Sequence, residues 1–142
     1  MTDPVTEPEW SQAFDTVAGP QTLGRLQSCL DDLWTEHGEI PDVVRDNIAV
    51  AAYEICTNII EHSGAGQPVR MRMELRLEPE RVEIIFTDDG KPAVVDLDSV
   101  NFPPALADRG RGLAIAKGVL DELSYRRKDD RNQWLLTHRR FV

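Results

Sequence analysis

The sequence predicts an α+β two-layer sandwich, in which helices cover one face of a mainly antiparallel sheet. Two helical patterns follow a first strand-like segment, and a pair of alternating strand-like runs comes next. A third helical pattern then precedes two final strands. This order groups strands with strands instead of alternating them with helices, which is typical of an antiparallel sheet. At 142 residues the chain has the length of one domain.

The first half of the chain predicts one strand and two helices. Trp10–Val17 has the aromatic and branched residues of a short strand. Pro20 begins a helix with apolar residues at helical spacing, and His37-Gly38 ends it. A second helix is predicted from Pro41, placed in its first turn, to about His62. Its core-facing stripe is Ile48, Ala52, Ile55 and Ile59.

Two alternating runs follow and predict paired strands, Val69–Leu77 and Arg81–Thr87. In the first run, apolar residues alternate with arginines, so one face is buried and the other is wet. The arginines resemble a phosphate patch, but on an alternating strand we interpret them as a solvated face. Lys91–Asp108 has three prolines and no periodicity, which predicts a long functional loop. The rest predicts a helix with apolar positions from Leu113 onward and two last strands, Leu123–Arg127 and Gln133–Arg139.

Composition narrows the class of protein. The net charge of -9 argues against a nucleic-acid partner, because phosphates would meet a repelling field. No apolar run approaches the about 20 residues of a membrane span, and the acidic start does not read as a secretory signal. Cys29 and Cys56 lack paired-motif spacing, which favours two buried cytosolic thiols over a disulfide or metal site. We expect residues 1–9 to be loosely ordered and 10–142 to form one domain.

The first motif with chemical potential lies on the second predicted helix. Glu54, Asn58 and His62 are four residues apart and therefore share one helix face. An acid beside an amide suits a hydrated Mg²⁺, which prefers hard oxygen ligands. His62 is a candidate base, although a histidine at a helix C-terminus is commonly only a cap. An ordinary polar helix face explains the same residues when the motif is taken alone.

The second motif is Asp88-Asp89-Gly90 at the end of a predicted strand. A strand ending in Asp-x-Gly places a carboxylate and then lets the backbone turn sharply. A buried carboxylate at that position can accept a hydrogen bond from an exocyclic amine such as adenine N6. Asp-Gly is also a frequent turn dipeptide, so a plain strand-ending turn is the alternative.

The third motif is Arg109-Gly110-Arg111-Gly112-Leu113, which we place at the opening of the third helix. Glycines free the backbone amides to approach an anion, and a helix start adds about half a positive charge. Arg109 and Arg111 are candidates for phosphate contact, with at least one expected to face solvent. Neither the P-loop pattern nor a Gly-x-Gly-x-x-Gly following a strand is present.

Taken in order, the three motifs resemble the N, G1 and G2 boxes of the GHKL superfamily of ATPases and kinases, which has the Bergerat-type (HATPase_c) fold. Within it, the chain resembles the RsbW-like bacterial anti-sigma-factor serine kinases over roughly residues 10–140. That narrower likeness rests on the run Glu54-x-x-Thr57-Asn58-x-x-Glu61-His62, on the stand-alone size, and on the short box Asp88-Asp89-Gly90-Lys91-Pro92.

The resemblance implies ATP and Mg²⁺ as cofactors. It implies that Asn58 binds the metal, that Glu54 acts as the base, and that Asp88 reads adenine. The segment Lys91–Asp108 would close over the phosphates. The nucleotide-binding residues that it implies are Asn58, Asp88, Gly90, Arg109, Gly110, Arg111, Gly112 and Leu113.

The resemblance also implies an activity: phosphorylation of a serine or threonine on a STAS-domain anti-sigma-factor antagonist. Binding of that antagonist or of a sigma factor, a homodimer and a cytoplasmic location are implied with it. Two alternatives remain open. A histidine-kinase catalytic domain shares the boxes but needs a phosphoacceptor-histidine helix, and a nucleotide-dependent binding module would sequester a partner without transferring phosphate.

Two positions depart from the family pattern. Pro92 replaces the second glycine of a full Asp-x-Gly-x-Gly box. The threonine often found near adenine on the penultimate strand is not clearly present, because Leu135 or Leu136 stands there and Thr137 is only nearby.

Overall fold

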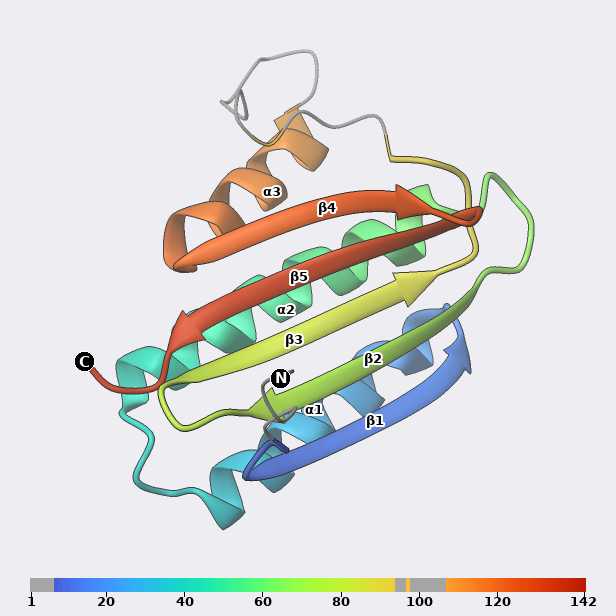
Figure 1. Ribbon diagram of the computed structural model, residues 1–142. Coiled ribbons are helices and arrows are strands. Elements are labelled where there is room, and N and C mark those ends of the chain that lie inside the picture. The colour runs from blue at the N-terminus through green and yellow to red at the C-terminus, as the bar shows by residue number, and fades with distance from the viewer. Residues whose placement is uncertain (1–6, 94–96, 98–106) are drawn as a thin grey trace, which may run out of the picture.

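The described chain folds into one five-stranded sheet and three helices. The computed structural model describes residues 7–93, 97 and 107–142, and for residues 107–110 it describes the backbone alone. This part of the chain confirms the predicted order of elements (Figure 1). They are β1 (Trp10–Val17), α1 (Pro20–Glu36), α2 (Asp42–His62), β2 (Arg70–Leu77), β3 (Arg81–Asp88), α3 (Ala107–Val119), β4 (Glu122–Lys128) and β5 (Arg131–Arg139).

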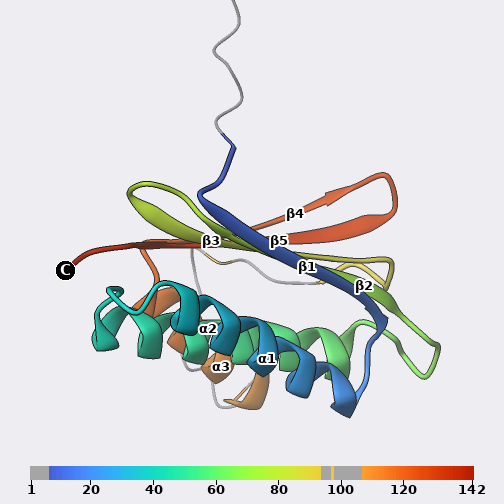
Figure 2. The ribbon, with the colours of Figure 1, turned by 90° about the horizontal axis from the view of Figure 1, so that it is seen from below.

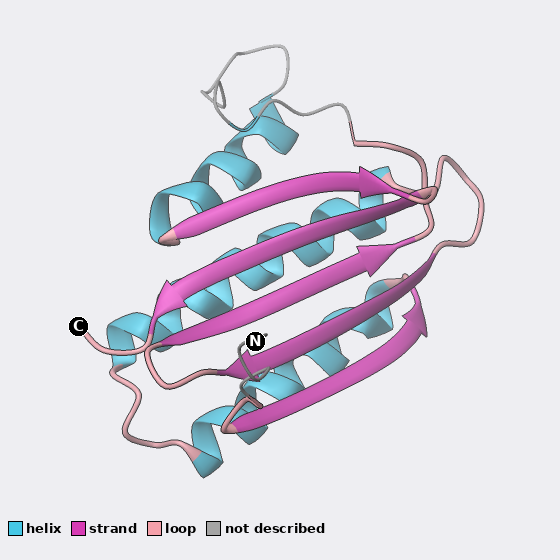
Figure 3. Ribbon diagram, in the orientation of Figure 1, coloured by secondary structure: helices cyan, strands magenta, loops and turns pink. Residues whose placement is uncertain are grey.

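The sheet has the strand order β1-β2-β3-β5-β4, and each neighbouring pair is antiparallel (Figure 3). Seen along the sheet, all three helices lie on one side of it (Figure 2). The predicted α+β two-layer sandwich is therefore confirmed. Asp129 and Asp130, which join β4 to β5, both have positive φ, as the tight hairpin turns that match strand twist require.

The central helix α2 packs against the middle of the sheet and against both other helices. Its predicted stripe is buried, with Ile48, Ala52, Ile55 and Ile59 at most 2% exposed. These side chains pack against the inward residues of β2 and β3, such as Met73 and Phe86, in one core cluster. Truncating a buried isoleucine to alanine typically costs about 2–5 kcal/mol. This packing fixes α2 against the sheet, with its C-terminus beside the end of β3.

Helix α1 covers the outer edge of the sheet. Pro20 begins it, the Thr22 hydroxyl accepts a hydrogen bond from Gly19 N at 3.1 Å, and the helix ends at His37. Two α1 side chains donate hydrogen bonds to backbone carbonyls of β1, which is an edge strand. Arg25 Nη1 donates to the Asp15 carbonyl at 2.9 Å, and Gln21 Nε2 donates to the Val17 carbonyl at 2.8 Å.

The buried side chain of Arg140 links three separate segments of the chain. The Arg140 side chain is 8% exposed and donates to Glu9 Oε2 at 2.6 Å, to Glu39 Oε1 at 2.9 Å and to the Glu78 carbonyl at 3.2 Å. These contacts join the N-terminal segment, the α1–α2 connection and the β2–β3 turn. Residues 1–6 lie outside the described part, so the expectation of a loosely ordered segment 1–9 remains a prediction.

Several predicted boundaries are wrong. Pro41 is the N-cap of α2 and not part of its first turn, since its backbone is extended (φ -60°, ψ 148°). The helix α3 begins at Ala107, so the predicted turn Gly110–Gly112 lies inside the helix and the predicted loop loses its last two residues. Each glycine costs about 1 kcal/mol in a helix, and packing against α2 can outweigh that local preference. Of Lys91–Asp108, residues 94–96 and 98–106 lie outside the described part.

Two smaller expectations have clear outcomes. Cys29 and Cys56 are buried and not disulfide-bonded, as predicted. Ile115, expected among the apolar core positions of α3, is instead 37% exposed. No helix in the described residues combines the length and the apolar character needed to cross a membrane.

Candidate functional site

The first sequence motif lines a small pocket between α2 and α3. Glu54, Asn58 and His62 are joined there by Gly112 and Leu113 of α3 and by Thr57 and Glu61 of α2, around a volume of about 60 Å³. Asn58 is 7% exposed and Leu113 is 3% exposed. The Thr57 hydroxyl is buried and has no hydrogen-bond partner within the described residues. The structure thus brings the first motif together with part of the third.

Gly112 of the third motif allows a close contact between α2 and α3. A β carbon added to Gly112 would collide with Glu54 Oε2, so the absence of a side chain lets the carboxylate lie against α3. Arg111 is exposed. For Arg109 and Gly110 the structure describes the backbone alone, so their expected phosphate contacts stay predictions.

Asp88 of the second motif ends β3 as a buried carboxylate, 1% exposed. Its Oδ1 accepts hydrogen bonds from Gly90 N and from Asn132 Nδ2, both at 2.9 Å. Its Oδ2 is buried and accepts none from any residue that the structure describes. Burial raises the pKa of Asp88, although the hydrogen bonds from Asn132 and Gly90 act in the opposite direction. A buried acceptor without a donor is costly in a folded protein, which points to a donor supplied by a ligand.

Ser63 connects the two motifs. It follows the last residue of α2, and its carbonyl accepts a hydrogen bond from Lys91 N at 2.9 Å. A β carbon at Gly90 would stand 2.5 Å from the Ser63 carbonyl oxygen and 2.6 Å from its Cβ, so only glycine fits there. The turn after Asp88 is therefore pressed against the C-terminal end of α2, whose last turns carry Glu54 and Asn58. From Glu54 to Ser63 the helix spans about 13 Å.

Sequence reasoning missed the residue next to Asp88. Asn132 lies opposite Asp88 in the β3–β5 register and is 1% exposed. The sequence predicts a last strand that starts at Gln133, which leaves Asn132 outside it, whereas β5 starts at Arg131. Thr137, which lies only near the position of the family threonine in the sequence, pairs with Glu83, five residues before Asp88 on β3. The signal for Asn132 is the pair Asp129-Asp130, which suits a two-residue hairpin turn and places Asn132 inside β5.

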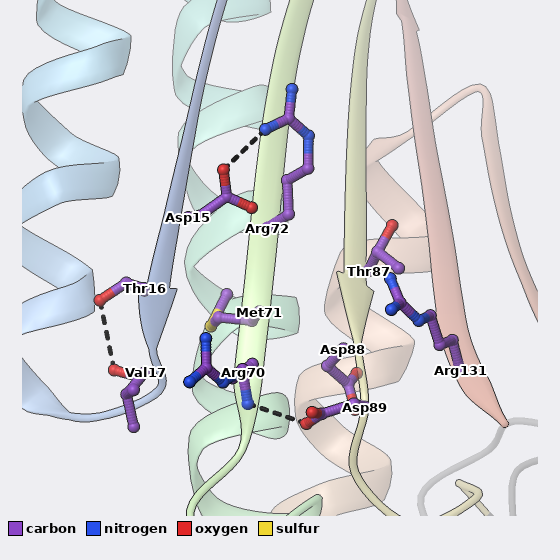
Figure 4. A pocket seen from close by; sticks show the side chains of 10 residues that line it. All are labelled: Asp15, Thr16, Val17, Arg70, Met71, Arg72, Thr87, Asp88, Asp89 and Arg131. Atoms are coloured by element: carbon purple, nitrogen blue, oxygen red, sulfur yellow. Dashed lines mark hydrogen bonds and ion pairs between the residues drawn. The ribbon is translucent and has the colours of Figure 1, made fainter.

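A larger pocket of about 520 Å³ lies at the same end of the sheet (Figure 4). Its lining includes Asp88, but also residues of the outward face such as Arg72, Thr87 and Arg131. Along β3 the side chain of Thr87 lies on the outward face, whereas Asp88 lies on the buried face with Phe86. Its carboxylate therefore belongs to the helix side of the sheet, together with Glu54 and Asn58. We take the helix side as the candidate site, because it joins the three motifs.

Comparison with known proteins agrees with this geometry. The model of a family described as "Histidine kinase-like ATPase domain" matches residues 16–137. The chain belongs to this family. No curated protein matched the sequence. Membership in the histidine kinase-like ATPase family makes this a GHKL-type, ATPase-like domain, as the three boxes had suggested.

Two solved structures share the fold of this histidine kinase-like ATPase domain. One contains the RsbU and RsbW domains of Rv1364c from Mycobacterium tuberculosis, with a TM-score of 0.64 and 20% identity, covering 95% of this chain and 35% of that one. The chain thus spans about a third of that protein's length. The other is the Acinetobacter baumannii histidine kinase AdeS, with a TM-score of 0.50 and 10% identity, covering 89% of this chain and 68% of that one.

Proposed function

We propose that the protein is an ATP-dependent serine/threonine-protein kinase and anti-sigma factor of a partner-switching system. Its substrate is a STAS-domain anti-sigma-factor antagonist. The observation that carries this proposal is the arrangement along α2. Glu54 and Asn58 of α2 share one pocket, and the turn after Asp88, whose Oδ2 accepts no hydrogen bond from a described residue, packs against Ser63 at the C-terminal end of the helix.

The residues present fit a bound Mg-ATP. Asp88 Oδ2 is a buried acceptor that lacks a donor, which an amino group on the base would supply. Gly90 and Gly112 are positions where a β carbon would collide with its surroundings, so the chain keeps both places free of side chains. Asn58 offers a hard amide oxygen of the kind that Mg²⁺ accepts. The stretch of about 13 Å between Ser63 and Glu54 leaves room for the ribose and the triphosphate between a nucleobase at Asp88 and a terminal phosphate near Glu54.

The phosphoryl group and the neutralising positive charge would come from bound Mg-ATP. The protein would position the reactants and supply a general base. Asp88 would hold the nucleobase. Leu113 lines the α2–α3 pocket and packs in the core. Glu54 Oε2 accepts the proton of the incoming serine hydroxyl, and Gly112 leaves the space in which that carboxylate lies. Asn58 lies one helical turn after Glu54, so the metal that it would hold stays apart from this general base.

The proposed partners follow from the RsbW-like resemblance and the RsbW-containing structural neighbour. The protein would bind the antagonist or a sigma factor according to nucleotide state, act as a homodimer and work in the cytoplasm. Residues 91–106 would serve as the segment that covers the phosphates, and Arg109 or Arg111 would contact them.

Phosphate transfer from radiolabelled ATP to purified STAS-domain proteins of the source genome tests the activity. Glu54→Gln should lower the transfer rate by about 10²- to 10⁴-fold while Mg-ATP affinity stays close to wild type. Asp46→Asn is the matched control, because Asp46 is an exposed carboxylate on the same helix. That control should transfer phosphate at the wild-type rate.

One result would overturn the kinase assignment, and another would overturn only the role of Glu54. The first is a wild-type protein that binds Mg-ATP but labels none of these partners, which would make the protein a nucleotide-dependent binding module. The second is a Glu54→Gln variant as active as wild type, which would remove Glu54 from the chemistry.

A further inference from the structure

Asn132 of β5 is the centre of a buried polar network beside Asp88. Its amide nitrogen Nδ2 donates to Asp88 Oδ1 at 2.9 Å and to the Lys91 carbonyl at 2.8 Å. Its oxygen Oδ1 accepts from the Tyr125 hydroxyl at 2.5 Å and from Arg127 Nη1 at 3.1 Å. Both hydrogens and both lone pairs of the amide are therefore used. Turning the amide over would set its oxygen against two acceptors, Asp88 Oδ1 and the Lys91 carbonyl, so its orientation is fixed.

The network extends to the chain that leaves the Asp88 turn. The Tyr125 hydroxyl accepts a hydrogen bond from Ala93 N at 3.0 Å, and Arg127 Nη1 donates to the Gly90 carbonyl at 2.6 Å. The ring of Tyr125 also packs against Trp134, with centroids 4.7 Å apart. Side chains of β4 and β5 thus hold Gly90–Ala93 as well as Asp88.

We propose that Asn132 is a positioning residue that sets the nucleobase selectivity of the site. The proposal rests on the assignment of Asp88 to the base in the proposed function. Asn132 Nδ2 and Gly90 N both occupy Oδ1 of the carboxylate, which leaves Oδ2 as the oxygen available to a ligand. A purine with an amino group at carbon 6 donates to Oδ2, whereas a purine with hydrogen or oxygen there leaves it unsatisfied.

Without the donor at position 132, one hydrogen bond remains to hold the carboxylate in this rotamer. Asp88 can then turn about its terminal torsion, which is broad for aspartate, and share its oxygens among other donors. The site loses the single fixed acceptor that distinguishes an amine from other substituents. We therefore expect the preference for a nucleotide with the amine to fall strongly. The affinity for a nucleotide that lacks the amine should change less.

Calorimetric titration of the full chain with two ligands tests this inference. The ligands are ATP and the triphosphate of purine riboside, which lacks the 6-amino group, each with Mg²⁺. Wild type should prefer ATP by about 10- to 100-fold, the worth of one hydrogen bond to a charged group. Asn132→Leu, close in volume and without a donor, should reduce this ratio to within about threefold of one. A purely structural role would weaken both ligands equally and leave the ratio unchanged, which would overturn the inference.

Two further variants complete the test. Tyr125→Phe keeps the ring on Trp134 and removes one donor to Asn132, so it should lower the ratio by about threefold without loss of folding. Asn47→Leu is the matched control, because Asn47 pairs with His138, which lies at the far end of β5 from Asn132. It should retain the wild-type ratio, and a lowered ratio in this variant would also overturn the inference. A wild type with a ratio near one would refute the base assignment of Asp88, while kinase activity is judged separately by phosphate transfer.

Discussion

The carboxylate of Glu54 on α2 lies directly against the α carbon of Gly112 on α3. The atom that a β carbon would meet is the far end of a flexible side chain, so the fold can adapt by moving Glu54 away. Gly90 differs, because its β carbon would meet the backbone oxygen of Ser63. Substitution of Gly112 should therefore cost mainly activity, whereas substitution of Gly90 should cost mainly stability.

Gly112→Ala should leave the protein folded but displace Glu54. We expect phosphate transfer to fall by about 10²-fold or more, as for loss of a general base. The unfolding midpoint in urea should change little, because alanine favours the helix by about 1 kcal/mol and offsets the local crowding. Gly118→Ala on the same helix meets no atom within 4 Å and serves as control. An active, normally folded Gly112→Ala protein would contradict the placement of Glu54.

Gly90→Ala should destabilise the fold itself. The added carbon would stand 2.5 Å from the Ser63 carbonyl, and rigid backbone cannot yield as a side chain does. We expect a loss of about 1–3 kcal/mol in the free energy of unfolding, typical of overpacking. Urea denaturation measures it, with Gly24→Ala in α1 as the control, because that site is open. Equal stability of Gly90→Ala and wild type would show that the turn does not press on α2.

Asp88→Asn should separate binding from stability. The pKa of Asp88 is raised by burial, so its contribution to stability is present below the unfolded pKa of 3.8 and is lost as pH rises through the folded value. An uncharged amide avoids that penalty, and the variant should be at least as stable as wild type at pH 7. ATP affinity should nevertheless fall by roughly 30- to 150-fold, or 2–3 kcal/mol. Calorimetry with unchanged affinity would remove Asp88 from the nucleotide site.

Asn58→Ala should weaken ATP binding only where the metal is present. Asn58 is buried in the pocket that also contains Glu54, which suits a ligand of Mg²⁺. With Mg²⁺ we expect about a tenfold loss in ATP affinity, equal to about 1.4 kcal/mol. In EDTA the variant and wild type should bind ATP alike. Losses of the same size under both conditions would assign Asn58 to packing.

Acid should weaken the contacts around Glu39. Its pKa is lowered from 4.5 to about 2 by its own backbone amide, by Arg140 and by His37. A lowered folded pKa means that stability is present above pH 4.5 and is lost as pH falls towards 2. Glu39→Gln should therefore have a flatter dependence of the urea midpoint on pH between about 4.5 and 2. Identical curves for the variant and wild type would rule out this contribution.

The alternating and helical patterns were sufficient to predict the elements of the fold. β2 alternates apolar and polar residues over its whole length, and α2 carries a clear apolar stripe, so local sequence determines both. The start of α3 could not be predicted in this way. Gly110 and Gly112 locally favour a turn, and packing of α3 against α2 decides the outcome.

The candidate site could be proposed from the sequence where a single segment carries its motif. Glu54, Asn58 and Asp88 were found from local motifs, and the structure brings their segments together at Ser63. Asn132 was missed because its importance depends on the pairing of β5 with β3, which joins residues 44 positions apart. No pattern within β5 specifies that register, and only the folded sheet places Asn132 opposite Asp88.

The cover that α1 provides for β1 has a consequence for association between copies. Exposed edge strands are templates for strand addition by another chain and thus for amyloid-like growth. At this edge Arg25 and Gln21 already occupy the Asp15 and Val17 carbonyls, so an incoming strand must first displace both donors. Substitutions that shorten these two side chains would open the edge to polymerisation while leaving the core intact.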